Sequence, residues 1–346
     1  MRVDQEGRVR AAMAGLNPGY FALVMATGIL SVAMNNRGLG TLSLFLLWLA
    51  VGCLIVLAVA TVWRLIAFPA RVRADLRDPT RSFGFFTVVA AVDVVGTRFA
   101  GDGYRTTALV LLLVGGVCWV VLGYVIPWLA TVGEREHSPI ESANGTWFIW
   151  VVATQSVAVL AATLQPRAST GGEALGLLAV FSWSVGTFLY ASAGTFVAIR
   201  LLLYPLRPVD MGPPYWVAMG ATAITVLAGA RIGETTSQPV AHPFVVGASV
   251  AFWGFGTWLV PALLGAGWWR HVVHRVPLRY EPALWAIVFP IGMYGVASHE
   301  LGTVTDIAVI RRIGDVEAWV ALPVWTLAFV AMIWSWIRPQ GSGAVR

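Results

Sequence analysis

The chain has 346 residues, of which 58% are hydrophobic and 12% charged, and its formal net charge is +6. The charged share is about half of that in soluble globular domains, so the composition excludes a water-soluble surface. All 23 basic residues are arginines that lie between apolar runs, which argues against nucleic-acid binding. We therefore expect the lipid bilayer to be the main solvent.

Apolar stretches of about 20 residues recur along the chain, each long enough to cross a hydrocarbon core roughly 30 Å thick. Gly, Pro and Arg separate them. The predicted spans are 18–35, 41–66, 82–99, 106–129, 145–164, 174–203, 214–232, 244–267, 282–299 and 317–337. The connections are short except for 64–81, so we predict one all-α transmembrane domain over residues 1–346.

The first span follows two basic residues, Arg8 and Arg10, and ends at Ser31-Val32-Ala33, a small-x-small site. This layout also fits a secretory signal peptide. An internal repeat favours a membrane span, because the first span aligns with the later odd-numbered spans.

The odd-numbered spans share an aromatic or aliphatic anchor pair, and its position recurs at residues 21, 86, 148, 216 and 285. The intervals are 65, 62, 68 and 69 residues, about the length of two membrane spans. The repeating unit is therefore a helical hairpin, present five times in parallel orientation. Five parallel inner helices can surround an axis.

Composition separates the two helices of each hairpin. The even-numbered spans are nearly unbroken aliphatic runs, which suit lipid contact. The odd-numbered spans carry polar residues that are costly in lipid unless they face a bundle interior or water. These residues are Thr27, Ser31, Asp93, Thr97, Thr154, Gln155, Thr222 and Thr225. A single threonine is explained by an interhelical hydrogen bond worth about 1 kcal/mol, whereas the whole set indicates an axial pathway.

The larger share of the arginines falls in the N-terminal segment, the connections from even to odd spans and the C-terminal segment. The positive-inside bias then places both termini in the cytoplasm of a cell whose inner or plasma membrane holds the chain.

Four segments carry a family resemblance: 17–31, 91–98, 252–258 and 289–294. The first, Asn-Pro-Gly-Tyr-Phe-Ala-Leu-Val-Met-Ala-Thr-Gly-Ile-Leu-Ser, resembles the opening of the tellurite-resistance/dicarboxylate transporter family. That family includes bacterial tellurite-resistance proteins, fungal malate and sulfite transporters and plant slow anion channels. The resemblance implies a quasi-fivefold bundle with odd helices lining a central pore, assembled as a homotrimer with one pore in each protomer.

The resemblance also implies an aromatic gate at Phe289, directly before Pro290. The equivalent repeat positions are Met25, Ala90, Val152 and Gly220, so one ring lies among smaller side chains. A hydrophobic constriction can gate by excluding water. The alternative is that Phe289 packs between helices. Pro290 predicts a kink beside the ring.

One turn further along, the repeat places Gly28, Asp93, Gln155, Ala223 and Gly292 at a second pore-lining level. Asp93 would lie roughly 16 Å deep in its span, where a carboxylate is costly and is a functional candidate. It could couple anion movement to protons. The alternatives are an ion pair with an arginine or a protonated acid with one hydrogen bond.

Three arginines, Arg37, Arg98 and Arg231, lie at or near the outer ends of odd spans and could concentrate anions at the pore mouth. Snorkelling to the interface is the alternative for each of them.

These features favour transport of a small anion, with a C4-dicarboxylate such as malate ahead of tellurite, sulfite, nitrate or chloride. An intramembrane enzyme would need clustered ionisable groups, and Asp93 is almost alone at mid-depth. A membrane receptor would need a soluble signalling module, and the sequence shows none. Neither a metal nor another cofactor is expected, because Cys53, Cys118, His271 and His274 have no partner set and nucleotide-binding motifs are absent.

Overall fold

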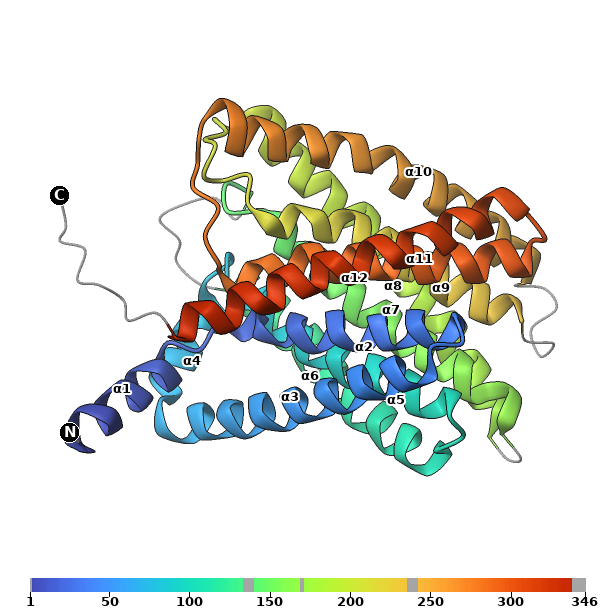
Figure 1. Ribbon diagram of the computed structural model, residues 1–346, viewed down its shortest axis with the longest axis horizontal. Helices are drawn as coiled ribbons and strands as arrows, with labels where there is room; N and C mark the ends of the chain where they lie inside the picture. Colours follow the sequence, from blue (N-terminus) through green and yellow to red (C-terminus); the bar gives the residue numbers. More distant parts are fainter. Residues whose placement is uncertain (1, 133–139, 169–170, 235–241, 338–346) are drawn as a thin grey trace.

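The computed structural model describes residues 2–132, 140–168, 171–234 and 242–337. Within these ranges the chain is helical, and none of it forms a strand. The long helices run side by side in a bundle, and α1 (Arg2–Ala14) projects beyond one end (Figure 1). The predicted all-α polytopic fold is confirmed. The predicted cytoplasmic C-terminal segment, 338–346, lies outside the described residues.

Five helices form an inner set: α2 (Ala22–Asn36), α5 (Thr87–Gly101), α7 (Phe148–Leu164), α9 (Val217–Gly233) and α11 (Trp285–Val304). Between 78% and 83% of the most apolar stretch in each of the first four is buried. Nearly all of α11 up to residue 302 is buried as well. These are the odd-numbered spans of the sequence.

Five longer helices form an outer set: α3 (Gly40–Ala67), α6 (Arg105–Thr131), α8 (Gly172–Leu203), α10 (His242–Trp268) and α12 (Ala308–Ile337). Only 17% to 33% of their most apolar stretches is buried. Their exposed side chains are mainly aliphatic and aromatic, so these helices present their surface to lipid.

Contacts follow the hairpin order. Each inner helix packs against the outer helix that comes next in the chain. The inner helices also pack against one another in the order α2, α5, α7, α9, α11, and α11 returns to α2. The inner set therefore closes into a ring. That a fivefold rotation relates the hairpins stays a prediction.

A short 3-10 turn precedes every inner helix: η1 (Pro18–Phe21), η2 (Ser82–Phe86), η3 (Gly145–Trp147), η5 (Pro213–Trp216) and η7 (Pro282–Leu284). Proline in the first turn favours the start of three of them, since its missing N–H has no helical partner there. Asn17 and Asn144 cap two turns by accepting 2.8 Å hydrogen bonds from the N–H groups of Gly19 and Thr146.

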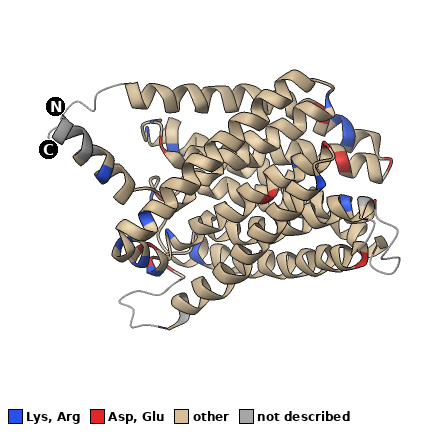
Figure 2. Ribbon diagram, turned by 90° about the horizontal axis from the view of Figure 1, so that it is seen from below, with Lys and Arg blue, Asp and Glu red and all other residues tan. Residues whose placement is uncertain are grey.

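Nine helices in the described part of the chain are long and apolar enough to cross a membrane. The tenth predicted span, 282–299, is formed by turn η7 and helix α11, which continues through His299 and Glu300 to residue 304. The connection 64–81 contains a short helix, α4 (Pro69–Arg77). Charged residues gather toward the two ends of the bundle (Figure 2).

Candidate pore through the inner helices

A cavity of about 180 Å³ opens among the 3-10 turns and the first turns of the inner helices. We call it the vestibule. All five repeats line it, through Asn17, Gly19, Ala22, Met25, Thr80, Arg81, Gly84, Thr87, Thr146, Ile149, Val152, Pro214, Val217, Pro282, Ala283, Ala286 and Phe289. Because every inner helix contributes, the vestibule lies on the axis of the ring.

A second, smaller cavity of about 20 Å³ lies toward the C-terminal ends of the inner helices. We call it the outer cavity. It is lined by Ile29, Val32, Val94, Thr97, Ser156, Val159, Ile224, Leu227, Arg231, Met293 and Val296, again from all five inner helices. Two cavities therefore share the axis of the ring.

The lining residues recur at the intervals of the sequence repeat. Met25, Val152 and Phe289 belong to one level and line the vestibule. The next lining level lies four residues further along each helix and belongs to the outer cavity: Ile29, Val94, Ser156, Ile224 and Met293. The boundary between the cavities thus falls at the level of Phe289.

Phe289 has the largest side chain at this level and is 2% exposed. The other predicted members, Ala90 and Gly220, are buried. Gly220 packs against Pro290, since a Cβ there would lie 2.8 Å from the proline Cγ. Helix α11 continues through Pro290 without interruption.

Asp93 is fully buried but lines neither of the two cavities. Its Oδ2 accepts a 2.8 Å hydrogen bond from Oγ of Ser156, which lines the outer cavity. Its Oδ1 lies against Gly115 of outer helix α6, where a Cβ would collide with it, and has no hydrogen-bond partner among the described residues. The carboxylate is therefore one hydrogen bond away from the pathway.

The other residues predicted at the level of Asp93 also lie outside the two cavity linings. Nε2 of Gln155 donates to the carbonyl of Trp183 on outer helix α8 at 3.2 Å. Gly28 leaves room for Val94, and Gly292 leaves room for Ile29. Ala223 is buried on α9. These side chains serve contacts between helices, whereas the residues one position later line the outer cavity.

The three outer arginines have different surroundings. Arg98 is 4% exposed and donates to Oγ of Ser43 at 3.0 and 3.2 Å, while also pairing with Asp102. Arg37 pairs with Asp315 on α12 at 3.1 Å. Neither lines a cavity on the axis. Arg231 does line the outer cavity, so the structure places one of the three on the pathway.

The vestibule contains a cation that sequence reasoning missed. Arg81 lines it and pairs with Asp75 at 2.8 Å, and Asp75 also accepts from Arg64 at 2.5 Å. One carboxylate thus faces two guanidinium groups. The sequence signal was the place of Arg81 directly before a repeat anchor segment. Among the described residues, no group of three His, Cys, Asp or Glu side chains could hold a metal ion.

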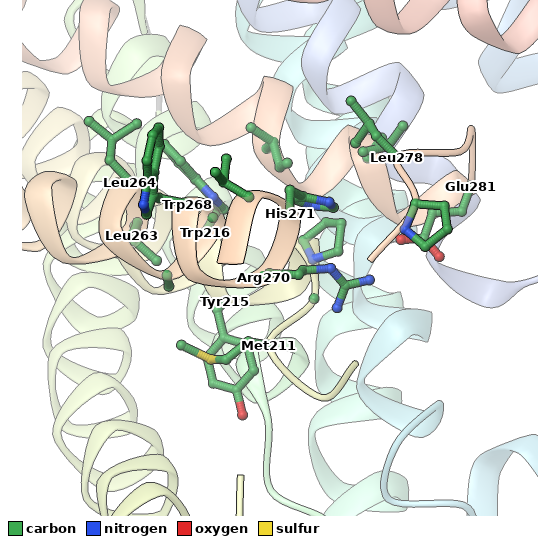
Figure 3. Close-up of a pocket in the computed structure, with 18 of the residues that line it drawn as sticks. Met211, Tyr215, Trp216, Leu263, Leu264, Trp268, Arg270, His271, Leu278 and Glu281 are labelled. Atoms are coloured by element: carbon green, nitrogen blue, oxygen red, sulfur yellow. The ribbon is translucent and has the colours of Figure 1, made fainter. Parts of the chain in front are cut away.

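A larger cavity of about 530 Å³ lies beside the ring, among turn η5, the C-terminal end of α10 and the start of α11. Trp216, Trp268, Arg270 and His271 come together there (Figure 3). It draws on the fourth and fifth repeats and not on the other three. This cavity is therefore not part of the axial pathway.

Together, the closed inner ring, its axial cavities and the lipid-facing outer helices define a polytopic helical membrane protein with an internal pathway. The family model described as voltage-dependent anion channel, SLAC1, matches residues 15–333. The chain belongs to this family, which confirms the predicted resemblance and the class of anion channels and transporters.

Individual relatives agree with this assignment. An uncharacterized membrane protein of Mycobacterium tuberculosis is 60% identical over 149 residues, which are 42% of this chain and 76% of the relative. An uncharacterized transporter of Methanocaldococcus jannaschii is 26% identical over 329 residues, 90% of this chain and 91% of the relative. A sulfite efflux pump of Arthroderma otae is 22% identical over 351 residues, 93% and 91% of the two chains.

Proposed function

We propose that this protein moves small anions from the vestibule, past the level of Phe289, to the outer cavity. The observation that carries the proposal is the position of Phe289 at the boundary between two cavities that all five inner helices line. In this closed arrangement the phenyl group of Phe289 interrupts the pathway.

The electrostatics of the vestibule support an anionic cargo. The N-terminal ends of all five inner helices surround it, and each helix carries a partial positive charge at that end. Arg81, Arg64 and their shared partner Asp75 together carry one net positive charge, and no acidic residue is among the described lining residues. The hydroxyl of Thr146 is buried without a hydrogen-bond partner among the described residues and could donate to an anion.

The gate consists of Phe289 and Pro290. Pro290 removes one backbone hydrogen bond from α11 and so weakens the helix where the ring must move. A rotation of the Phe289 side chain toward the vestibule would join the two cavities, and water would then enter the constriction.

The cargo is a C4-dicarboxylate such as malate, as the family resemblance implies. Sulfite is the second candidate, because relatives covering 93% of this chain are named sulfite efflux pumps. The chain acts as a homotrimer in the cell membrane with its termini in the cytoplasm. The predicted arginine bias supports that orientation.

Purified protein in liposomes tests the proposal. We expect flux of malate or sulfite above that of empty liposomes at a set voltage and pH gradient, with chloride, nitrate and tellurite compared on the same preparation. Equal flux of every anion in liposomes with and without the protein would contradict transport. Dependence on voltage alone would identify a channel, and dependence on the proton gradient a coupled carrier.

A further inference from the structure

The outer cavity ends at one charged side chain. Arg231 is the single charged residue among the described residues that line it. Its Nη2 donates to Oε1 of Glu300 on α11 at 2.7 Å, and its Nη1 donates to Glu234 at 3.1 Å. Its Nε is buried and has no hydrogen-bond partner among the described residues. Two carboxylates thus hold the guanidinium through its Nη atoms.

Glu300 receives a second hydrogen bond from a third inner helix. Nδ2 of Asn36, at the end of α2, donates to the same Oε1 at 2.9 Å. Residues 36, 231 and 300 are separated by the same cumulative intervals as the repeat anchors at 21, 216 and 285, so they occupy one level of the ring. One carboxylate therefore bridges α2, α9 and α11 across the outer end of the pathway.

We propose that Arg231 is the anion-binding group at the outer end of the pathway, and that Glu300 occupies it as a tethered competitor for the transported anion. A carboxylate and a transported oxyanion offer a guanidinium the same charge-assisted hydrogen bonds. An anion that reaches the outer cavity displaces Glu300 from Arg231 and accepts the hydrogen bond that Nη2 now donates to Glu300. The inference rests on the proposed anion transport and names its outer binding site.

Substituting Glu300 by glutamine tests the competition. Glu300→Gln retains the size of the side chain and an oxygen for Asn36 and Arg231 but removes the charge. We expect the half-saturating sulfite or malate concentration, applied from the outer side, to fall at least threefold. Arg231→Gln should raise it at least threefold. In the double variant, Glu300→Gln should have no further effect, because the competition acts through Arg231.

The matched control is Asp315→Asn, which removes the charge that Arg37 of α2 and Nδ1 of His299 on α11 both contact near the same end of the bundle. Asp315 lines neither axial cavity, so the half-saturating concentration should stay at the wild-type value. Asn36→Ala serves as a second variant, because Asn36 is exposed and its loss removes one partner of Glu300. It should lower the half-saturating concentration less than Glu300→Gln does.

A binding measurement separates this inference from transport itself. A bound anion stabilises the folded protein, so sulfite or malate should raise the melting temperature of detergent-solubilised Glu300→Gln protein more than that of wild type. Arg231→Gln should abolish the shift. Equal shifts in wild type and Glu300→Gln would overturn the competition even if liposomes conduct. Absent flux with the expected shifts would instead contradict the proposed transport and leave the binding site standing.

Discussion

Pro290 on α11 fills the space that Gly220 leaves on α9: a Cβ at position 220 would lie 2.8 Å from the proline Cγ and 3.3 Å from its Cα. The two helices therefore lie in close contact next to Phe289. Gly220→Ala should destabilise the protein by roughly 1–3 kcal/mol through overpacking, measured as a lower melting temperature in detergent. Gly52→Ala on α3 is the control, because nothing lies within 4 Å of its Cβ position. An unchanged melting temperature for Gly220→Ala would contradict the close contact.

Truncation of Phe289 should open the pathway. Phe289→Ala removes the largest side chain at the boundary of the two cavities, so anion conductance in liposomes should rise at least tenfold. Phe86→Ala is the matched control, since Phe86 is equally buried, stacks on Trp150 at 5.8 Å and lines neither cavity.

The two variants should differ in stability as well. Loss of a fully packed ring costs roughly 3–5 kcal/mol, which we expect for Phe86→Ala. Phe289→Ala should cost less because its ring already borders a cavity. A well-folded Phe289→Ala protein with wild-type conductance would contradict the gate.

Asp93 is expected to link anion movement to protons through Ser156. Asp93→Asn retains the shape of the side chain but cannot titrate, so flux should persist while its dependence on the pH gradient disappears. Ser156→Ala breaks the 2.8 Å hydrogen bond between Asp93 and the outer cavity and should weaken the same dependence. Full pH dependence in both variants would make Asp93 a structural residue.

Arg98 should act in folding, because its guanidinium joins α2, α3 and α5 through Asn35, Ser43 and Asp102. Arg98 is buried whereas Asp102 is exposed, so the cost comes from the hydrogen bonds of the guanidinium, each worth roughly 1.5–3 kcal/mol. Arg98→Gln should therefore lower the melting temperature. The half-saturating anion concentration of the remaining folded protein should not change. A stable Arg98→Gln protein with weakened anion affinity would place Arg98 on the pathway instead.

The connection before α9 should confer acid sensitivity. The hydrogen bond from Arg207 lowers the pKa of the Asp210 carboxyl below its usual value. A carboxyl whose pKa is lowered in the folded state stabilises the fold at pH values above its unfolded pKa of about 3.9. This stabilisation is lost as the pH falls through the folded-state pKa. Asp210→Asn should therefore melt below wild type at neutral pH, and the difference should vanish in acid. A difference that is constant with pH would exclude this ion pair as its origin.

The sequence predicted the helices and the ring because both follow from periodic patterns. Apolar length locates the spans, and the repeat interval puts Met25, Val152 and Phe289 on one level. The next level was harder to predict. In a helix with 3.6 residues per turn, positions three and four further along lie on either side of the same face. The polar side chains of Asp93 and Gln155 suggested that the positions three residues further along line the pathway. These side chains instead face neighbouring helices. The positions four residues further along, such as Ser156 and Met293, line the outer cavity.

Polar partners across the ring were not foreseen for a related reason. Arg231 and Glu300 are 69 residues apart, and a single sequence does not reveal which charges meet. The spacing was nevertheless informative, because it equals the interval between the last two repeats. The Arg231–Glu300 contact can therefore be predicted by pairing each arginine with an acidic residue at the equivalent position of the next repeat.

Building the ring from one chain has a consequence for the shape of its bore. A homopentameric channel must present five copies of each side chain at every level, so a phenylalanine there would form a closed iris of five rings. In this protein the level of Phe289 holds one phenylalanine, and Gly220 on the neighbouring helix leaves space for Pro290. The proposed constriction is therefore asymmetric, and a change in one side chain can alter its width while the other four helices keep their sequence.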